Sequence, residues 1–119
     1  MKRTLIIGAS SNPTRYSYMA TVRLKAKHHE VFPMGIRQGE IQGEPIITEQ
    51  LALEDIDTVS LYVGPKNQGP WIDYIIGLSP KRVIFNPGTE DLDSIRKVQN
   101  AGIKAEIACT LVMLSAGTY

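Results

Sequence analysis

The chain has 119 residues, of which 43% are hydrophobic and 21% charged, and its net charge is about +1. We expect one globular domain over residues 1–119. The net charge gives no indication of a basic surface that would bind nucleic acid. No apolar run approaches the roughly 20 residues that span a bilayer, and residues 4–7 are too short for the core of a signal peptide, so we expect a cytoplasmic protein without a membrane segment. The single cysteine, Cys109, cannot form an internal disulfide, and we interpret it as a small buried residue.

Short apolar runs alternate with stretches of helical character. We expect strands at residues 4–7, 30–34, 57–63, 82–85 and 104–108, and a small extra strand at 45–48. We expect four helices. The first covers residues 17–27, the second begins at residue 67 or 68 and ends at 78, and the last covers residues 110–114. The third begins after its N-cap residue Thr89 and ends at residue 100. Residues 35–44 are interpreted as a loop and 51–53 as a helical turn at most, and Pro33 is expected to end the second strand.

This alternation predicts an α/β fold: a Rossmann-like, doubly wound and mostly parallel five-stranded sheet with helices on both faces. In such a sheet, ligands bind at the carboxyl ends of the strands, where the winding reverses. The strand ends in question are residues 8–15, 34–37, 63–67 and 86–89, all rich in glycine, proline or small polar residues.

The segment after the first strand has the composition of a phosphate-binding turn. A glycine directly after a buried strand lets a phosphate approach the backbone, and the helix that follows points its positive end at the same spot. The segment lacks the full G-x-G-x-x-G fingerprint, and a plain tight turn remains an alternative. The candidate ligand-binding residues are Gly8, Ala9, Ser10, Ser11, Asn12 and Arg15.

The end of the second strand favours a phosphorylated nucleotide over NAD. An NAD site usually has an acidic residue here, whereas this chain has Gly35, Ile36 and Arg37. An arginine suits the 3′-phosphate of coenzyme A or the 2′-phosphate of NADP. Arg37 could also be a solvated loop charge.

The two remaining strand ends supply further candidates, namely Gly64, Pro65, Asn86, Pro87 and Gly88. No Ser/His/Asp, Cys/His or metal-ligand constellation can be assembled at this edge of the sheet. We therefore expect no catalytic residue and no metal ligand.

Nearly the whole chain carries an ordered set of short blocks: Gly8-Ala9-Ser10, Asn12-Pro13, Arg15-Tyr16-Ser17, Val31-Phe32-Pro33, Gly43-Glu44 and Asn86-Pro87-Gly88. This order resembles the small stand-alone CoA-binding proteins, which are similar to the N-terminal CoA-binding domain of succinyl-CoA synthetase α subunits and acyl-CoA synthetases. The resemblance implies a Rossmann-like domain that binds coenzyme A. It assigns Gly8, Ala9, Ser10, Asn12 and Arg15 to the phosphate turn and Arg37 to the nucleotide end of the ligand.

Three functions remain open on the sequence alone. The first is a non-catalytic module that binds CoA or acyl-CoA, with a homodimer as one possible assembly. The second is an NADP-binding enzyme, or a CoA-ligase subunit that needs a larger partner chain. The third is a ligand-free interaction scaffold, because the chain has no arginine near Val63-Gly64, and Leu114 stands where the family commonly has histidine.

Overall fold

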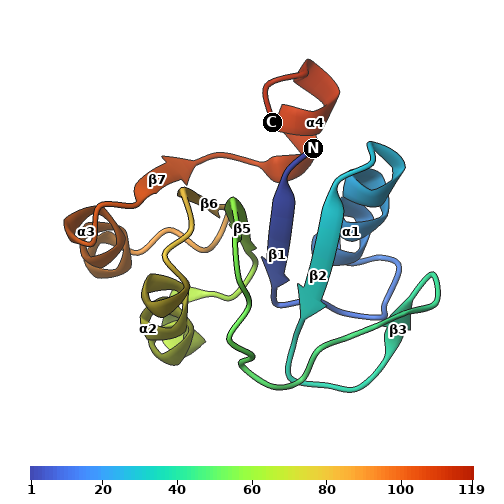
Figure 1. The fold of residues 1–119 in the computed structure, drawn as a ribbon, viewed down its shortest axis with the longest axis horizontal. Helices are drawn as coiled ribbons and strands as arrows, with labels where there is room; N and C mark the ends of the chain where they lie inside the picture. The colour runs from blue at the N-terminus through green and yellow to red at the C-terminus, as the bar shows by residue number, and fades with distance from the viewer.

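Five parallel strands form the central sheet of the computed structural model, which describes residues 1–119 (Figure 1). In chain order these strands are β1 (Arg3–Ile7), β2 (Glu30–Met34), β5 (Thr58–Leu61), β6 (Arg82–Phe85) and β7 (Lys104–Ile107). Their spatial order is β2-β1-β5-β6-β7, so the winding reverses between β1 and β5. This confirms the predicted Rossmann-like α/β sheet, and it makes the carboxyl ends of β1 and β5 the expected ligand position.

Helices cover both faces of the sheet (Figure 1). Helices α1 (Tyr16–Ala26) and α4 (Thr110–Ala116) pack together on one face, and α2 (Gly69–Leu78) and α3 (Leu92–Asn100) pack together on the other. The larger core lies between the sheet and α2 and α3, and a smaller cluster lies under α1 and α4. Because both faces are covered, the central strands β1, β5 and β6 are buried and mostly apolar in the sequence. No helix is both long enough and apolar enough to cross a membrane.

The segment after β2 differs from the prediction. It contains a small antiparallel hairpin of β3 (Glu40–Ile41) and β4 (Glu44–Pro45), where we expected a loop and then a strand at 45–48. Ile47 makes only an isolated parallel bridge to Met34. Pro33 lies inside β2 and does not end it, which is tolerated because β2 is an edge strand of the sheet. Residues 51–53 contain no helix.

The third main strand of the sheet is shorter than expected. We predicted residues 57–63, but β5 ends at Leu61. The Tyr62 N–H still donates to the Ile7 carbonyl at 2.8 Å. Beyond that point both neighbouring strands have ended, β1 at Ile7 and β6 at Phe85, so β5 has no partner with which to continue.

The start of α3 also corrects a prediction. The N-cap is Asp91, whose carboxylate accepts from the Ser94 backbone N–H at 3.0 Å. Thr89 is buried two residues earlier, and its hydroxyl donates to the Asn86 carbonyl at 2.8 Å. Thr89 therefore closes the turn after β6 and does not cap the helix. The 3₁₀ turn η1 (Pro65–Asn67) precedes α2.

Removing the cap should destabilise the domain. We expect Asp91→Ala to lower the free energy of unfolding by about 1 kcal/mol, because an N–H of the first helical turn loses its acceptor. Urea denaturation of the purified variant measures this change. Asp93→Ala, in the same turn but without such a bond, is the matched control, and an equal loss in both variants would contradict the assignment.

Candidate functional site

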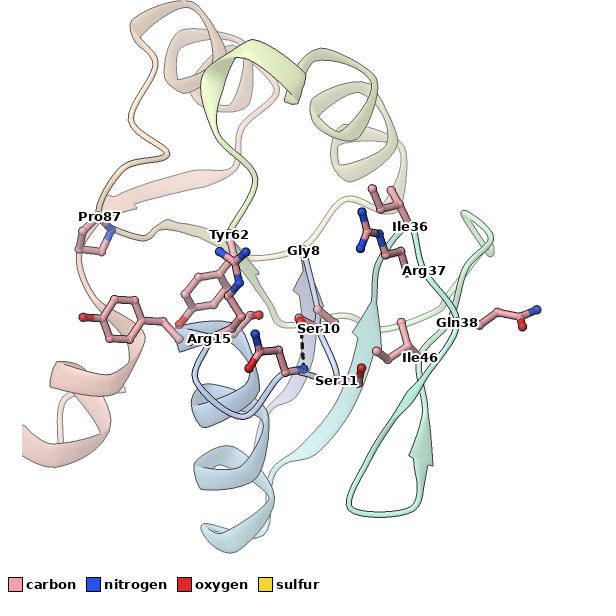
Figure 2. Close-up of a pocket in the computed structure, with 14 residues that line it drawn as sticks. Gly8, Ser10, Ser11, Arg15, Ile36, Arg37, Gln38, Ile46, Tyr62 and Pro87 are labelled. Carbon is pink, nitrogen blue, oxygen red and sulfur yellow. Dashed lines mark hydrogen bonds between the residues drawn. The ribbon is translucent and has the colours of Figure 1, made fainter.

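A cavity of about 600 Å³ lies at the carboxyl ends of β1, β2 and β5, where the winding of the sheet reverses (Figure 2). It therefore occupies the position expected for a ligand in this fold. The lining residues are Gly8, Ala9, Ser10, Ser11, Asn12, Arg15, Tyr16, Ser17, Ile36, Arg37, Gln38, Ile46, Tyr62 and Pro87.

The turn after β1 forms the floor of the cavity. Gly8 has a φ of +95°, and a Cβ atom there would lie 3.0 Å from the Tyr62 carbonyl carbon, so both conformation and space require glycine. The N–H groups of Gly8 and Ala9 both donate to the Met34 carbonyl, at 3.0 and 2.9 Å. These two bonds attach the turn to the end of β2.

Side chains within the same turn hold it in shape. The Asn12 Oδ1 atom accepts from both the N–H and the hydroxyl of Thr14, at 3.0 and 2.8 Å. The Ser10 Oγ atom accepts from the Asn12 N–H at 3.1 Å, drawn as a dashed line in Figure 2. These bonds hold the turn in its shape through contacts within the protein.

Several backbone donors at the cavity have no partner in the protein. The N–H groups of Ser10 and Ser11 donate no hydrogen bond, nor do those of Tyr16 and Ser17 at the start of α1. No side chain caps this helix, whose N-cap residue is Arg15. Unpaired N–H groups at a helix N-terminus attract an anion.

A second close approach positions the loop after β2. A Cβ atom on Gly35 would lie 2.5 Å from the Ala9 carbonyl oxygen, so only glycine lets the two loops touch. Gly35 itself does not line the cavity. The loop continues to Arg37, which Figure 2 shows on the opposite side of Gly8 from Arg15.

The cavity has a positive lining. Two of its residues, Arg15 and Arg37, are cationic, and no acidic side chain lines it. In particular, no carboxylate follows β2, where an NAD site usually has one to bind the ribose. The structure contains no cluster of three or more His, Cys, Asp or Glu side chains that could bind a metal ion. The cavity is thus suited to an anionic ligand.

Several sequence candidates lie outside the cavity. Gly64 and Pro65 are exposed around the start of η1, because β5 ends two residues early and places the edge of the cavity at Tyr62. Gly88 is also exposed, and its N–H donates to the Glu90 carboxylate at 2.6 Å. Pro87 is the one residue of its block that lines the cavity.

Asn86 is buried and faces the protein. Its amide nitrogen donates to the Ser60 hydroxyl and the Leu61 carbonyl, both at 2.9 Å, and its oxygen accepts from the Thr110 N–H at 2.8 Å. These bonds join β5, β6 and α4 behind the cavity. Cys109, expected to be buried, is partly exposed as the N-cap residue of α4 and does not line the cavity.

Sequence reasoning did not single out six of the lining residues as ligand contacts: Tyr16, Ser17, Ile36, Gln38, Ile46 and Tyr62. Four of them are adjacent or nearly adjacent in sequence to predicted ligand-binding residues, so this proximity could have identified them: Tyr16, Ser17, Ile36 and Gln38. Ile46 had no such signal, because the hairpin of β3 and β4 brings it back to the cavity.

Tyr62 has an unusual environment for a cavity residue. Its hydroxyl oxygen is buried and makes no hydrogen bond. Burial raises the pKa of Tyr62 to about 12, although the neighbouring Ser60 and Thr110 side chains oppose the shift. Tyr62 is therefore neutral near pH 7 and contributes shape, not charge, to the cavity wall.

The fold and the cavity define an α/β protein with a Rossmann-like sheet and an anion-compatible site at its winding reversal. The chain belongs to the CoA binding domain family, which matches residues 2–115. No curated protein matches the sequence.

Solved structures support the same fold. An uncharacterized protein with 50% sequence identity superposes with a TM-score of 0.98, over 100% of this chain and 98% of its own. Prb, a protein redesigned for binding, is 21% identical with a TM-score of 0.88, over 98% of this chain and 83% of its own. A hypothetical protein from Pyrococcus horikoshii OT3 is 24% identical with a TM-score of 0.85, over 97% and 82% of the two chains.

The approach of Gly35 to the Ala9 carbonyl yields a stability prediction. We expect Gly35→Ala to lower the free energy of unfolding by about 1–3 kcal/mol, because the added Cβ meets a backbone oxygen that cannot move independently. Gly64→Ala is the matched control, since its Cβ would meet no atom within 4 Å and its φ is −68°. Equal effects of the two substitutions in urea denaturation would refute this reading.

The buried hydroxyl of Tyr62 yields a pH prediction. A folded-state pKa above the unfolded value of about 10 means that the folded state holds this proton more tightly. The stability that it contributes is complete below pH 10 and is lost as pH rises toward 12. We therefore expect Tyr62→Phe to be at least as stable as wild type near pH 7, because the buried hydroxyl makes no hydrogen bond, and to lose less stability than wild type between about pH 10 and 12. Parallel pH profiles in chemical denaturation would show that the hydroxyl is solvated.

Proposed function

We propose that this protein binds coenzyme A or an acyl-CoA in the cavity at the carboxyl ends of β1, β2 and β5. The observation that carries the proposal is the combination of family membership with a cavity that contains two arginines and no acid. A CoA ligand carries a diphosphate and a 3′-phosphate, so it presents negative charge at two separate points.

The diphosphate fits the turn after β1. Unpaired N–H groups of Ser10, Ser11 and the first turn of α1 belong to residues that line this cavity, beside the positive end of that helix. Arg15 adds a guanidinium that can pair with phosphate oxygens in forked geometry. The hydrogen bonds that hold the turn around Asn12 reduce the ordering cost of binding.

The nucleotide end fits the loop after β2. Arg37 provides a cation for the phosphorylated ribose, and the exposed Ile36 side chain beside it offers an apolar surface to the base. The same arginine could bind the 2′-phosphate of NADP, so NADP is the competing ligand to test.

The proposed role is binding without catalysis. The titratable side chains that line the cavity are two arginines and two tyrosines, with no carboxylate, imidazole or thiol to act as acid, base or nucleophile. We infer a cytoplasmic carrier, sensor or partner module for CoA. A CoA-ligase fragment is the alternative, and it requires a larger partner chain that supplies the catalytic group.

Ligand-dependent melting tests the proposal. CoA at about a hundredfold over its dissociation constant should add about 2.7 kcal/mol to the stability of the folded state, which raises Tm by several degrees. Arg37→Ala should weaken CoA binding roughly tenfold or more and leave dephospho-CoA binding unchanged, because only CoA has the 3′-phosphate. Lys66→Ala, an exposed cation outside the cavity, is the control.

The outcomes separate the alternatives. A larger shift with NADP than with CoA would replace the proposed ligand. No shift with CoA, acetyl-CoA, NADP or NAD would indicate the scaffold function. Turnover of an acyl-CoA by the purified chain would contradict the non-catalytic role.

A further inference from the structure

The outer edge of β7 is unpaired. β7 is the last strand of the sheet, on the opposite side of β5 and β6 from β1 and β2, whose ends hold the cavity (Figure 1). The N–H groups of Lys104 and Ala108 donate inward, to the Lys81 and Phe85 carbonyls at 3.2 and 3.3 Å. Because backbone groups alternate in direction along a strand, those of Ala105 and Ile107 point outward.

This edge is only four residues long, and two of them are charged. It contains no proline, and the apolar side chain of Ile107 is 63% exposed. Only two charged residues limit what can pair with it: Lys104, whose side chain is 71% exposed, and Glu106. Their arrangement decides which partner strand is acceptable.

We propose that β7 pairs antiparallel with β7 of a second copy of this chain, with Ala105 of each copy opposite Ala105 of the other. In this register, the outward N–H and C=O groups of one strand face the outward N–H and C=O groups of the other and can form hydrogen bonds with them. It also places Lys104 of each copy opposite Glu106 of the other, so both cross-strand pairs have opposite charges. The strand is therefore complementary to itself in this register.

The neighbouring registers are disfavoured by charge. A shift of the twofold axis to residue 106 places Glu106 opposite itself, and a shift to residue 104 places Lys104 opposite itself. Like charges directly opposite each other destabilise an antiparallel pair. Among these three registers, the charges of Lys104 and Glu106 therefore favour the one in which Ala105 lies opposite Ala105.

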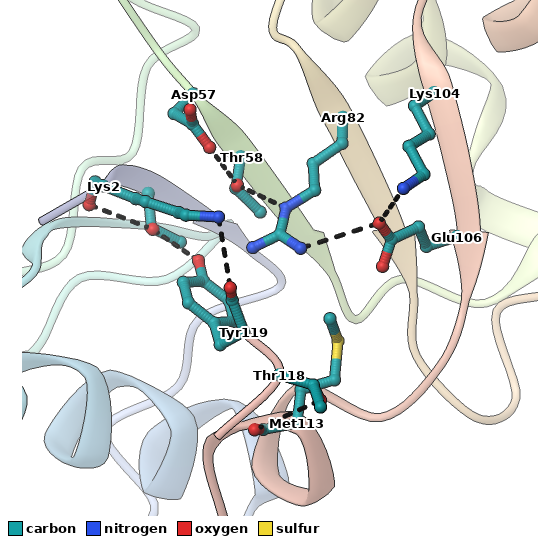
Figure 3. A network of polar contacts seen from close by, with 10 residues as sticks. Lys2, Asp57, Thr58, Arg82, Lys104, Glu106, Met113, Thr118 and Tyr119 are labelled. Atoms are coloured by element: carbon teal, nitrogen blue, oxygen red, sulfur yellow. Dashed lines mark hydrogen bonds and ion pairs between the residues drawn. The ribbon is translucent and has the colours of Figure 1, made fainter. Parts of the chain in front are cut away.

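The side chains are placed so that Lys104 of one copy can pair with Glu106 of the other. Within one copy, Lys104 Nζ lies 3.0 Å from Glu106 Oε1, and Arg82 Nη1 lies 3.6 Å from the same oxygen (Figure 3). Directly opposite residues at a non-hydrogen-bonded position have Cα atoms only about 4.5 Å apart, so Lys104 of the second copy reaches this carboxylate. The dimer would join two five-stranded sheets into one and leave both cavities open at its far sides.

Sedimentation equilibrium of the full chain, from micromolar to millimolar concentration, tests the proposal. We expect a reversible dimer whose dissociation constant rises roughly tenfold or more in Lys104→Glu, which sets two carboxylates against each other. Ala105→Pro should have the same effect, because it removes an outward N–H that makes no bond within the chain. Lys27→Glu changes the charge equally, on an exposed residue at the end of α1, and should leave the dimer intact.

A chain that stays monomeric throughout this range overturns the proposal, as does a dimer that persists unchanged in both variants. Circular dichroism and thermal unfolding confirm that each variant is folded. If Ala105→Pro does not fold, Lys104→Glu decides the question, because its side chain is exposed. A dimer weakened equally by Lys27→Glu would show a general charge effect and no β7 pairing.

Discussion

The contact between the turn after β1 and the turn after β2 is the constraint on which the shape of the cavity depends. The Met34 carbonyl accepts from two successive N–H groups, those of Gly8 and Ala9, and the Ala9 carbonyl lies where a side chain on residue 35 would be. These contacts set the direction in which the chain enters α1. They also hold the loop that carries Arg37 across the cavity from the helix start. A larger residue at Gly35 would separate the two halves of the site.

Buried polar groups hold the rest of the sheet in register. Asn86 links β5, β6 and the start of α4 through three hydrogen bonds behind the cavity. At the opposite end of the same strands, the Arg82 Nε atom donates to the Thr58 hydroxyl at 2.8 Å, and its guanidinium lies 4.5 Å from the centre of the Tyr119 ring (Figure 3). A charge buried this far is costly unless it is paired, and Glu106 supplies the pairing carboxylate. The polar residues in this core are therefore parts of the framework.

The proposed ligand site and the proposed dimer edge lie on different parts of the sheet. The cavity is formed by loops after β1, β2 and β5, with a positive lining on a chain whose net charge is only about +1. The free edge of β7 lies beyond β5 and β6 and has charges of both signs. Ligand binding and self-association can therefore occur without competing for the same surface. Local charge placement, not total charge, distinguishes the two surfaces.

The sequence by itself determined the fold and pointed to the edge of the sheet where the cavity lies, because strands buried on both faces are apolar runs bounded by glycine and proline, and parallel strands have their carboxyl ends at one edge. It also placed the turn from Gly8 to Arg15 at the cavity, since that turn is continuous in the chain. Only the tertiary structure decided where β5 ends, because this depends on where its two neighbours, β1 and β6, stop supplying partners, and Tyr62 follows directly at the cavity. It likewise turned Asn86 inward and brought Ile46 back through a hairpin. Such placements depend on packing between segments that are distant in sequence, which no local pattern records.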